Sequence, residues 1–177
     1  MDAIFTRRSV RKFLKTPVEM DKIEQLLKAA MQAPSAVNER SWEFIVVQDK
    51  GLLEKLAQLS PYAGVLKEVS TAIVALGNTK QMYFPEYWQL NLAAATQNIL
   101  LQAVELDLGA VWLGVAPEAD RMKYIADLFA LPEYVRPFAV IPIGYPETEN
   151  KFIDRYEPEK VHYDKYEAVE KSDALHG

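Results

Sequence analysis

Four short apolar segments alternate with longer segments of helical periodicity along this chain of 177 residues. The apolar segments are rich in β-branched residues and cover positions 44–47, 71–76, 109–115 and 138–144. Runs of this length and composition are typical of buried strands. Pro142 lies inside the last run and cannot donate to a strand ladder, so it predicts an edge position or a local irregularity there.

Helical spacing of apolar residues predicts helices over about 19–32, 52–59, 86–107 and 117–129. The longest of these is expected to be a central buried helix, with its apolar face made of Leu90, Ala93, Ala94, Gln97, Leu100, Leu101 and Val104. Its Ala-rich middle permits close approach of another helix or of a second subunit. The alternation of strands and helices predicts one α+β domain.

Three local features refine this assignment. Asp2 can cap a short first helix that carries Ile4 and Phe5 on its apolar side. The pair at 77–78 is expected to form a turn after the second strand, and Pro117 is expected in the first turn of the last helix.

Composition excludes several classes of function. The chain has no cysteine, which removes disulfides, Cys-ligated metals and a thiol nucleophile, and its two histidines supply a metal site or a hydrolase triad poorly. A formal net charge of -5 argues against a general nucleic-acid binder. No stretch reaches the about 18 apolar residues of a membrane helix. We therefore expect a cytoplasmic protein without nucleic-acid or membrane partners, whose reactivity comes from a bound cofactor.

The segment Arg7-Arg8-Ser9-Val10-Arg11 concentrates three arginines and a hydroxyl within five residues. Guanidinium groups offer planar forks of donors that suit phosphate oxygens. The same segment could be a solvated basic helix end. By itself it leaves both interpretations open.

Other stretches are also compatible with a planar, anionic ligand, and each has a structural alternative. The loop Pro34–Asn38 carries Ser35 and Asn38 but could be an ordinary helix-ending turn. Trp112-Leu113-Gly114 could bring backbone N–H groups close to a flat ring, or could be core with a turn glycine. Arg155 could be a surface charge. The aromatic stretch 82–88 could roof a substrate pocket or serve packing alone.

The composition changes after residue 146. Residues 147–177 are charged and tyrosine-rich with few aliphatic residues, so they bury little against their own domain. We expect a domain at 1–146 and a C-terminal extension at 147–177 that frays or wraps a partner, with its last residues disordered.

Several of these motifs, taken in order, resemble those of the nitroreductase family of FMN-dependent oxidoreductases. The segments that carry the resemblance are 7–13 (RRSVRKF), 33–42 (APSAVNERSW), 93–101 (AAATQNILL), 109–114 (GAVWLG) and 141–146 (IPIGYP). The resemblance extends from Ile4 to about Tyr163.

This resemblance implies a fold and an assembly. The family fold is a three-layer α+β sandwich with a central, mostly antiparallel sheet flanked by helices. Its members form an intertwined homodimer with two FMN molecules in the interface, each contacted by both chains. The tail of one subunit crosses over to the other, which gives residues 147–163 a role.

The same resemblance assigns roles to residues. Arg7, Arg8 and Ser9 would hold the FMN phosphate and ribityl chain, and Arg11 would reach the N1/O2 edge of the isoalloxazine. Residues contributed by the second subunit would be Pro34, Ser35, Ala36 and Asn38. The strand end Trp112, Leu113 and Gly114 would bring backbone N–H groups near N5 and O4, and Arg155 would return to the phosphate.

The implied activity is ping-pong electron transfer from NAD(P)H to a small aromatic acceptor such as a nitroaromatic compound or a quinone. A specialised reaction (reductive dehalogenation or flavin breakdown) and a non-catalytic FMN-binding or storage protein are the alternatives. Two departures from the family pattern concern the cofactor: Arg40-Ser41 replaces the Gln-Pro pair of many relatives, and Ile153 stands where some relatives have lysine.

Overall fold

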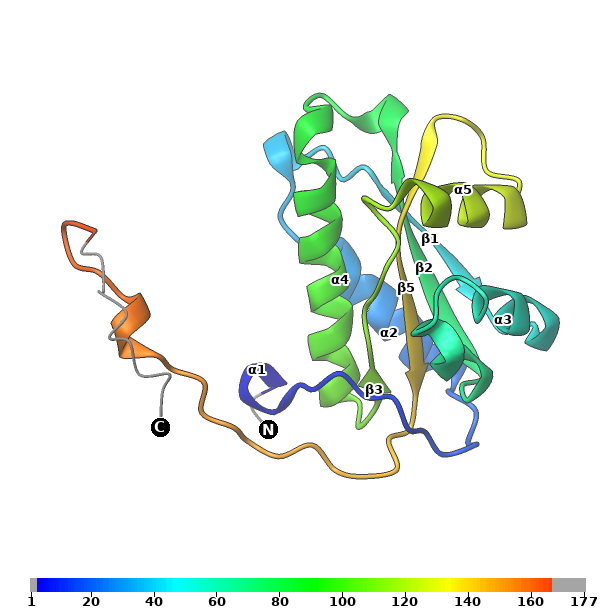
Figure 1. Cartoon of the computed structure of the whole chain (residues 1–177), viewed down its shortest axis with the longest axis horizontal. Helices are drawn as coiled ribbons and strands as arrows, with labels where there is room; N and C mark the ends of the chain where they lie inside the picture. The colour runs from blue at the N-terminus through cyan, green and yellow to red at the C-terminus, as the bar shows by residue number, and fades with distance from the viewer. Residues whose placement is uncertain (1–2, 167–177) are drawn as a thin grey trace, which may run out of the picture.

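A computed structural model describes residues 3–166 of the chain. Its middle layer is a five-stranded antiparallel sheet in the order β1-β2-β5-β3, with β4 also paired to β5 (Figure 1). The strands are β1 (Trp42–Val47), β2 (Thr71–Asn78), β3 (Gly109–Ala110), β4 (Leu113–Gly114) and β5 (Val135–Gly144). The α+β class and the antiparallel sheet are therefore confirmed.

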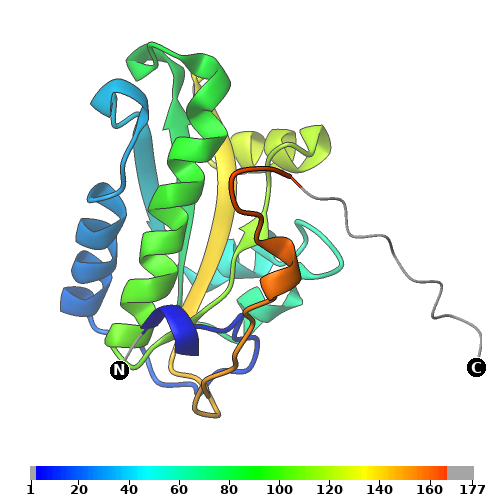
Figure 2. The same ribbon diagram turned by 90° about the vertical axis from the view of Figure 1, so that its left-hand side faces the viewer.

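Helices cover both faces of the sheet, which completes the three layers (Figures 1 and 2). One face carries α2 (Met20–Met31) and α4 (Trp88–Glu105), and the other carries α3 (Lys50–Leu56) and α5 (Ala119–Leu128). Short helices fill the connections: α1 (Ala3–Thr6), η1 (Ala36–Asn38), η2 (Ala63–Lys67), η3 (Thr79–Gln81), η4 (Pro85–Tyr87) and η5 (Pro158–Lys160). No helix between residues 3 and 166 has the length and apolarity needed to cross a membrane.

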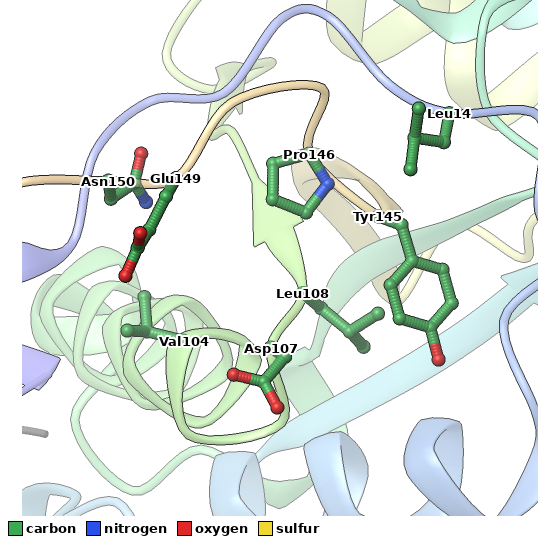
Figure 3. A pocket seen from close by; sticks show the side chains of 8 residues that line it. All are labelled: Leu14, Val104, Asp107, Leu108, Tyr145, Pro146, Glu149 and Asn150. Atoms are coloured by element: carbon green, nitrogen blue, oxygen red, sulfur yellow. The ribbon is translucent and has the colours of Figure 1, made fainter.

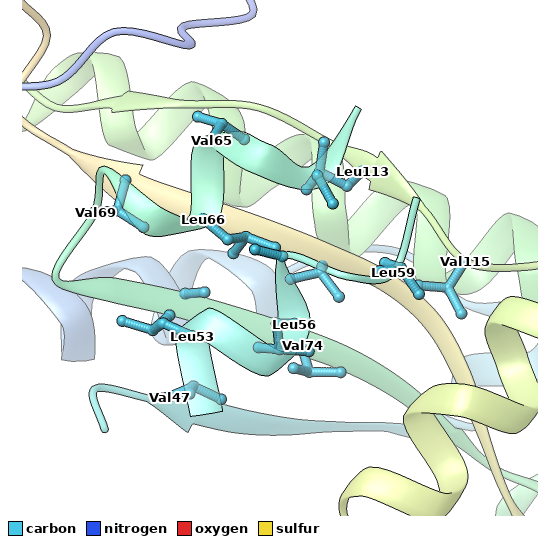
Figure 4. Close-up of a cluster of buried hydrophobic side chains, with 14 of the residues drawn as sticks. Val47, Leu53, Leu56, Leu59, Val65, Leu66, Val69, Val74, Leu113 and Val115 are labelled. Carbon is cyan, nitrogen blue, oxygen red and sulfur yellow. The ribbon is translucent and has the colours of Figure 1, made fainter. Parts of the chain in front are cut away.

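Two hydrophobic cores form because side chains of a strand alternate between the two faces of a sheet. In β2, Ile73 and Ala75 join the core under α2 and α4, whereas Ala72 and Val74 join the opposite core. Figure 4 shows that opposite core, where side chains of α3 and η2 meet those of the sheet. Every residue of β2 is buried, so this strand is covered on both sides.

Pro142 lies in a central strand, so the edge position considered for it is wrong and the local irregularity is what the structure contains. The pairing partners of β5 keep one register from Gly109 to Gly114, but the ladder is interrupted between β3 and β4, opposite Pro142. Val111 donates its N–H to the Pro142 carbonyl at 3.4 Å. Proline has no N–H to return that bond. The predicted single strand over 109–115 is thus split in two by the missing donor.

Helix α4 buries a different face from the one expected. Of the residues assigned to the apolar face, only Leu100 is buried, and Leu90 is 64% exposed. The residues that reach the core are Trp88, Asn91, Leu92, Ala95, Thr96, Ile99, Leu100 and Ala103. Because polar and apolar residues are mixed around this helix, and Asn91 and Thr96 are among its buried residues, periodicity could not decide which side meets the sheet.

Other local expectations need correction. Gly77 and Asn78 form no turn but complete β2, where a Cβ at Gly77 would lie 2.9 Å from Cε of Met82. Pro117 precedes α5, inside a turn closed by the Glu118 N–H on the Val115 carbonyl (3.0 Å).

The first helix also differs from its prediction. In α1, Ala3 and Thr6 are buried, whereas Ile4 and Phe5 face outward. The proposed cap Asp2 lies outside the described residues, as do residues 167–177 with their predicted disorder.

The start and the end of the chain run side by side below the sheet (Figures 1 and 2). Leu14 and Glu147 donate their N–H groups to the carbonyls of Tyr145 and Lys12 (2.8 and 3.2 Å). The Phe5 and Phe152 rings lie 5.6 Å apart. Beyond this point the extension leaves the domain, and residues 151–166 are exposed except for a half-buried His162.

A prediction concerns the close contact between the N-terminal segment and β3. A Cβ at Gly109 would lie 2.8 Å from three side-chain atoms of Val10. Gly109→Ala should therefore lower the free energy of unfolding by about 1–3 kcal/mol, as measured by urea denaturation. Gly64→Ala is the control, because a Cβ there meets no atom within 4 Å. The cost of Gly109→Ala should shrink in a Val10→Ala background; an equal cost in both backgrounds would contradict the prediction.

Candidate functional site

Three of the predicted cofactor-binding arginines gather at one cleft. Arg7 and Arg8 follow α1, and the C-terminal extension brings Arg155 beside them. A cavity of about 310 Å³ lies between the two segments and is lined by Ile4, Phe5, Arg7, Arg8, Ile153, Asp154, Arg155 and Tyr156. Residues almost 150 positions apart in the sequence therefore form one cationic surface.

The positive charge of this cleft is not neutralised by ion pairs. The salt bridges in the described part of the chain belong to lysines of α2, α5 and η5, and none involves these arginines. Partial burial, together with the charges of Arg155 and Arg8, lowers the pKa of Arg7. Like charges held together in this way favour the binding of an anion, which would relieve their repulsion.

Arg8 differs from Arg7 in its contacts. Its guanidinium donates to the carbonyls of Phe5 (3.1 Å) and Arg7 (2.6 Å), and to the carbonyl of Lys151 in the extension. Arg8 therefore ties the extension to α1, and its charge contributes to the cleft from a fixed position.

Ser9 and Arg11 lie along the edge of the sheet. Ser9 forms a parallel bridge with Ala110, and the Val10 N–H donates to the Ala110 carbonyl at 3.0 Å. Arg11 is exposed and donates to the Ser9 carbonyl at 3.3 Å. The N-terminal segment thus extends the sheet beyond β3 and directs its polar side chains to the outside.

Gly114 lies on the same edge, about 14 Å from Ala110 at the usual rise of a strand. Val111 and Val115 both donate to β5, so the alternation of the ladder directs the Leu113 N–H to β5 and the N–H and C=O of Gly114 to the open edge. The Gly114 carbonyl accepts from Arg121 at 3.1 Å. A Cβ at Gly114 would meet nothing within 4 Å. The backbone here is accessible to a flat ligand, next to the half-buried Trp112.

The loop Pro34–Asn38 has an unusual backbone. Val37 (φ 42°), Asn38 (φ 57°) and Arg40 (φ 47°) all adopt positive φ, which is rare outside glycine and most unfavourable for a β-branched residue. Ser35 supports this shape, because its Oγ accepts from the Arg40 N–H at 3.0 Å. Strained backbone of this kind clusters at ligand-binding sites.

Two residues that support this loop were not identified from the sequence. Asn91, in the first turn of α4, accepts from the Ala36 N–H (3.0 Å) and donates to Glu39 (2.7 Å). Glu39 also accepts from the Tyr83 N–H at 2.8 Å. Asn91 is one of several amide side chains in α4, so the sequence did not distinguish it, and Glu39 gave no signal either.

The two departures from the family pattern have local consequences. Ser41 is fully buried; its carbonyl accepts from the Asn78 N–H (2.7 Å) and its Oγ donates to Glu39 (3.4 Å). Hydrogen bonds therefore hold the loop where many relatives have proline. Ile153 lines the cationic cleft, so this position adds an apolar surface in place of a charge.

A single chain does not bring all the predicted residues together. The arginine segment lies beside the C-terminal part of α4, and the loop Pro34–Asn38 lies at its N-terminal turn (Figures 1 and 2). The 18 residues of α4 span about 27 Å between them. One ligand therefore contacts both groups only if a second copy of the chain supplies one of them.

A further cavity of about 290 Å³ contains none of the predicted cofactor residues (Figure 3). Next to it, Lys22 donates to the Tyr145 hydroxyl (2.8 Å), and this hydroxyl donates to Glu19 (2.8 Å). The bond to Tyr145 raises the pKa of Lys22, and a backbone bond and Tyr145 lower that of Glu19. These groups satisfy one another and join α2 to the end of β5, which is a structural role.

Comparison with known proteins identifies a family model and relatives that match this chain. The family model described as "Nitroreductase family" matches residues 4–63 and 63–145. A protein of Methanothermobacter thermautotrophicus with the provisional name NADH dehydrogenase/NAD(P)H nitroreductase is 43% identical over 94% of this chain and 87% of its own length.

Solved structures are also similar. A crystal structure from Clostridium acetobutylicum, provisionally named NADH oxidase, has a TM-score of 0.91 at 49% identity and covers 93% of this chain and 100% of its own. The FMN-dependent nitroreductase of Clostridium difficile R20291 has a TM-score of 0.85 at 33% identity, covering 93% and 99% of the two chains. The family match spans most of the sequence, and the fold is the same. The chain therefore belongs to the nitroreductase family.

Proposed function

We propose that this protein is an FMN-dependent oxidoreductase that takes electrons from NAD(P)H and passes them to a flat aromatic acceptor. The observation that carries the proposal is the cleft of Arg7, Arg8 and Arg155 at the end of an open sheet edge. Asp154 also lines this cleft, but within residues 3–166 none of the three arginines forms an ion pair. A phosphate suits such a cleft, since charge-assisted hydrogen bonds to arginine are strong and directional. The similarity to an FMN-dependent nitroreductase supports FMN as the ligand.

We propose that the chain contacts this cofactor at its phosphate, at its ribityl chain and at its ring. Arg7 and Arg155 would hold the phosphate, Ser9 would contact the ribityl chain, and the open backbone at Gly114 would lie against the ring. Arg11, exposed at the same edge, would place a permanent cation beside N1/O2, where reduction adds negative charge. Bound FMN supplies the redox chemistry, which accords with a chain that has no cysteine.

We propose that the active form is a homodimer and that each site is shared between the subunits. The loop Pro34–Asn38 of one chain would lie against the arginine cleft of the other chain and complete the site. Within one chain, α4 separates this loop from the arginine cleft. On the outward side of α4, Leu90 is 64% exposed next to the exposed polar residues Gln97 and Glu105, and the extension carries exposed aromatic residues such as Phe152 and Tyr156. Large apolar side chains that are exposed together on one side of a chain are typical of an interface between subunits.

The mechanism requires no acid or base from a side chain. The chain binds the cofactor, orients its ring with backbone groups and places a fixed positive charge at one edge. NAD(P)H and the acceptor would use the same open face in turn, so a ping-pong order is expected. The acceptor class is a nitroaromatic compound, a quinone or a molecule of similar shape.

The function is tested with purified protein loaded with FMN. We expect a yellow dimer that NADH or NADPH reduces under anaerobic conditions and that turns over with menadione or a nitrofuran. Flavin that binds but is not reduced by either nucleotide would indicate a storage protein instead. Reduced flavin that is reoxidised only by a halogenated substrate would indicate the specialised reaction.

A second prediction concerns the shared site. Leu90→Asp places a charge on the outward face of α4, where Leu90 is 64% exposed, so the fold should persist while the dimer dissociates. Light scattering should give a monomer, and FMN content should fall with the dimer fraction. Tyr62→Asp is the control, because Tyr62 is 78% exposed between α3 and η2, on the far side of the sheet. A dimer of full FMN content in Leu90→Asp would exclude this face as the interface.

A third prediction concerns the cationic cleft. Arg7→Ala should weaken FMN binding by about 1.5–3 kcal/mol, the contribution of a hydrogen bond to a charged group. Isothermal titration of the apoprotein with FMN measures this change. Lys67→Ala removes the same charge from an exposed position on the opposite layer and should leave the affinity unchanged. Equal affinity in wild type and Arg7→Ala would remove Arg7 from the site.

A further inference from the structure

We propose that Glu39 is a positioning residue that fixes the aromatic segment 82–84 against the loop 34–38 and thereby sets which electron acceptors the protein uses. This proposal rests on the proposed function, because it assigns the acceptor side of the same site. Glu39 touches neither cofactor nor acceptor; it would act through the segments that it joins.

The hydrogen bonds around Glu39 form a closed set. Its Oε1 accepts from Nδ2 of Asn91 at 2.7 Å, and its Oε2 accepts from the Tyr83 N–H at 2.8 Å. The Phe84 N–H approaches Oε2 at 3.4 Å. Asn91 in turn accepts from the Ala36 N–H at 3.0 Å. One half-buried carboxylate thus links the 34–38 loop, the start of α4 and the aromatic segment.

Only a carboxylate satisfies this set. The short bonds come from the N–H groups of Ala36 and Tyr83 and the amide of Asn91, and the acceptors are the Asn91 oxygen and both oxygens of Glu39. The Ser41 hydroxyl and the Phe84 N–H add two longer bonds to Glu39, each of 3.4 Å. A glutamine at position 39 replaces one acceptor with a donor, and turning Asn91 over would leave the Ala36 N–H without a partner. A donor left unpaired in this partly buried place is costly.

The hydrogen bonds of Glu39 act on a segment whose backbone is also held by neighbouring residues and whose rings are exposed. Met82 packs into the space that Gly77 leaves open, and Thr79 donates to the Tyr134 carbonyl at 2.7 Å. In contrast, the Tyr83 side chain is 79% exposed and that of Phe84 is 41% exposed. The exposed rings therefore take their position from the backbone of Tyr83 and Phe84, and this part of the backbone is held by the hydrogen bonds of Glu39.

The surface presented in this way suits a neutral aromatic molecule. Tyr83 and Phe84 line an open cavity of about 500 Å³ together with Val37, the strained residue of the 34–38 loop. The rings of Phe84 and Tyr87 are packed edge to face at 6.3 Å. These lining residues carry no charge that would hold the pyrophosphate of a dinucleotide, so they favour the acceptor over NAD(P)H.

The proposal is tested in the FMN-loaded dimer with Glu39→Gln and the matched control Glu86→Gln, which changes an exposed carboxylate in the same segment. For Glu39→Gln we expect the KM for menadione to rise about tenfold, the scale of one lost charge-assisted hydrogen bond. Measured per bound FMN, the rate of anaerobic reduction by NAD(P)H and the turnover with ferricyanide, which has no ring to stack, should remain unchanged. Glu86→Gln should behave as wild type.

A second measurement is independent of catalysis. Amide hydrogen exchange over residues 79–87 should be faster in Glu39→Gln than in wild type and Glu86→Gln, because the Tyr83 N–H loses its acceptor. Tyr83→Ala and Phe84→Ala should reproduce the increase in the KM for menadione without faster exchange at the 34–38 loop.

The opposite results would overturn the proposal. These are an unchanged KM for menadione in Glu39→Gln, an unchanged KM in both Tyr83→Ala and Phe84→Ala, or unchanged exchange over 79–87 in Glu39→Gln. An equal loss of turnover with menadione and ferricyanide would assign Glu39 to the cofactor and also contradict it. If wild-type protein bound no flavin or was not reduced by NAD(P)H, the proposed function would fail, while the exchange measurement would still decide whether the hydrogen bonds of Glu39 hold this segment.

Discussion

The burial of both faces of the central strands is the constraint on which the rest of the structure depends. All of β2 is buried, and in β5 only Arg136 is exposed. Two layers of helices are needed to cover such a sheet, and no polar ligand-binding group can lie on its faces without a large desolvation cost. Candidate functional groups are therefore confined to the edge beyond β3 and β4, the ends of helices and the loops between layers. This explains why the arginine segment, Gly114 and the 34–38 loop are where they are.

Helix α4 has two structural roles because it carries apolar side chains on its inner side and also on its outer side. Its inner face completes the core under the sheet, and its outer face remains exposed in the isolated chain. The same helix separates the arginine cleft from the 34–38 loop by its own length. In the proposed dimer, association of two chains would bring the two parts of the site together, so it would be coupled to cofactor binding.

Several features of the candidate site reduce the stability of the isolated chain. Arg7 and Arg155 repel each other in a partly buried cleft, and three residues near the 34–38 loop adopt positive φ without being glycine. Networks such as that of Asn91 and Glu39 hold the strained backbone in place. Unneutralised charge and fixed, strained loops are what a preorganised anion and ring site requires.

The sequence by itself determined the α+β class, the approximate positions of strands and helices and the family, since these depend on local periodicity and on motifs of adjacent residues. It also indicated the arginines and the 34–38 loop as candidates.

Tertiary structure decided the rest. Which side of α4 meets the sheet depends on the elements that pack against it, because polar and apolar residues are mixed around this helix. The break opposite Pro142 depends on a neighbouring strand, and the meeting of Arg7 with Arg155 depends on the path of the extension. The role inferred for Glu39 comes from three segments brought together in space, and no local pattern of residues encodes such a contact.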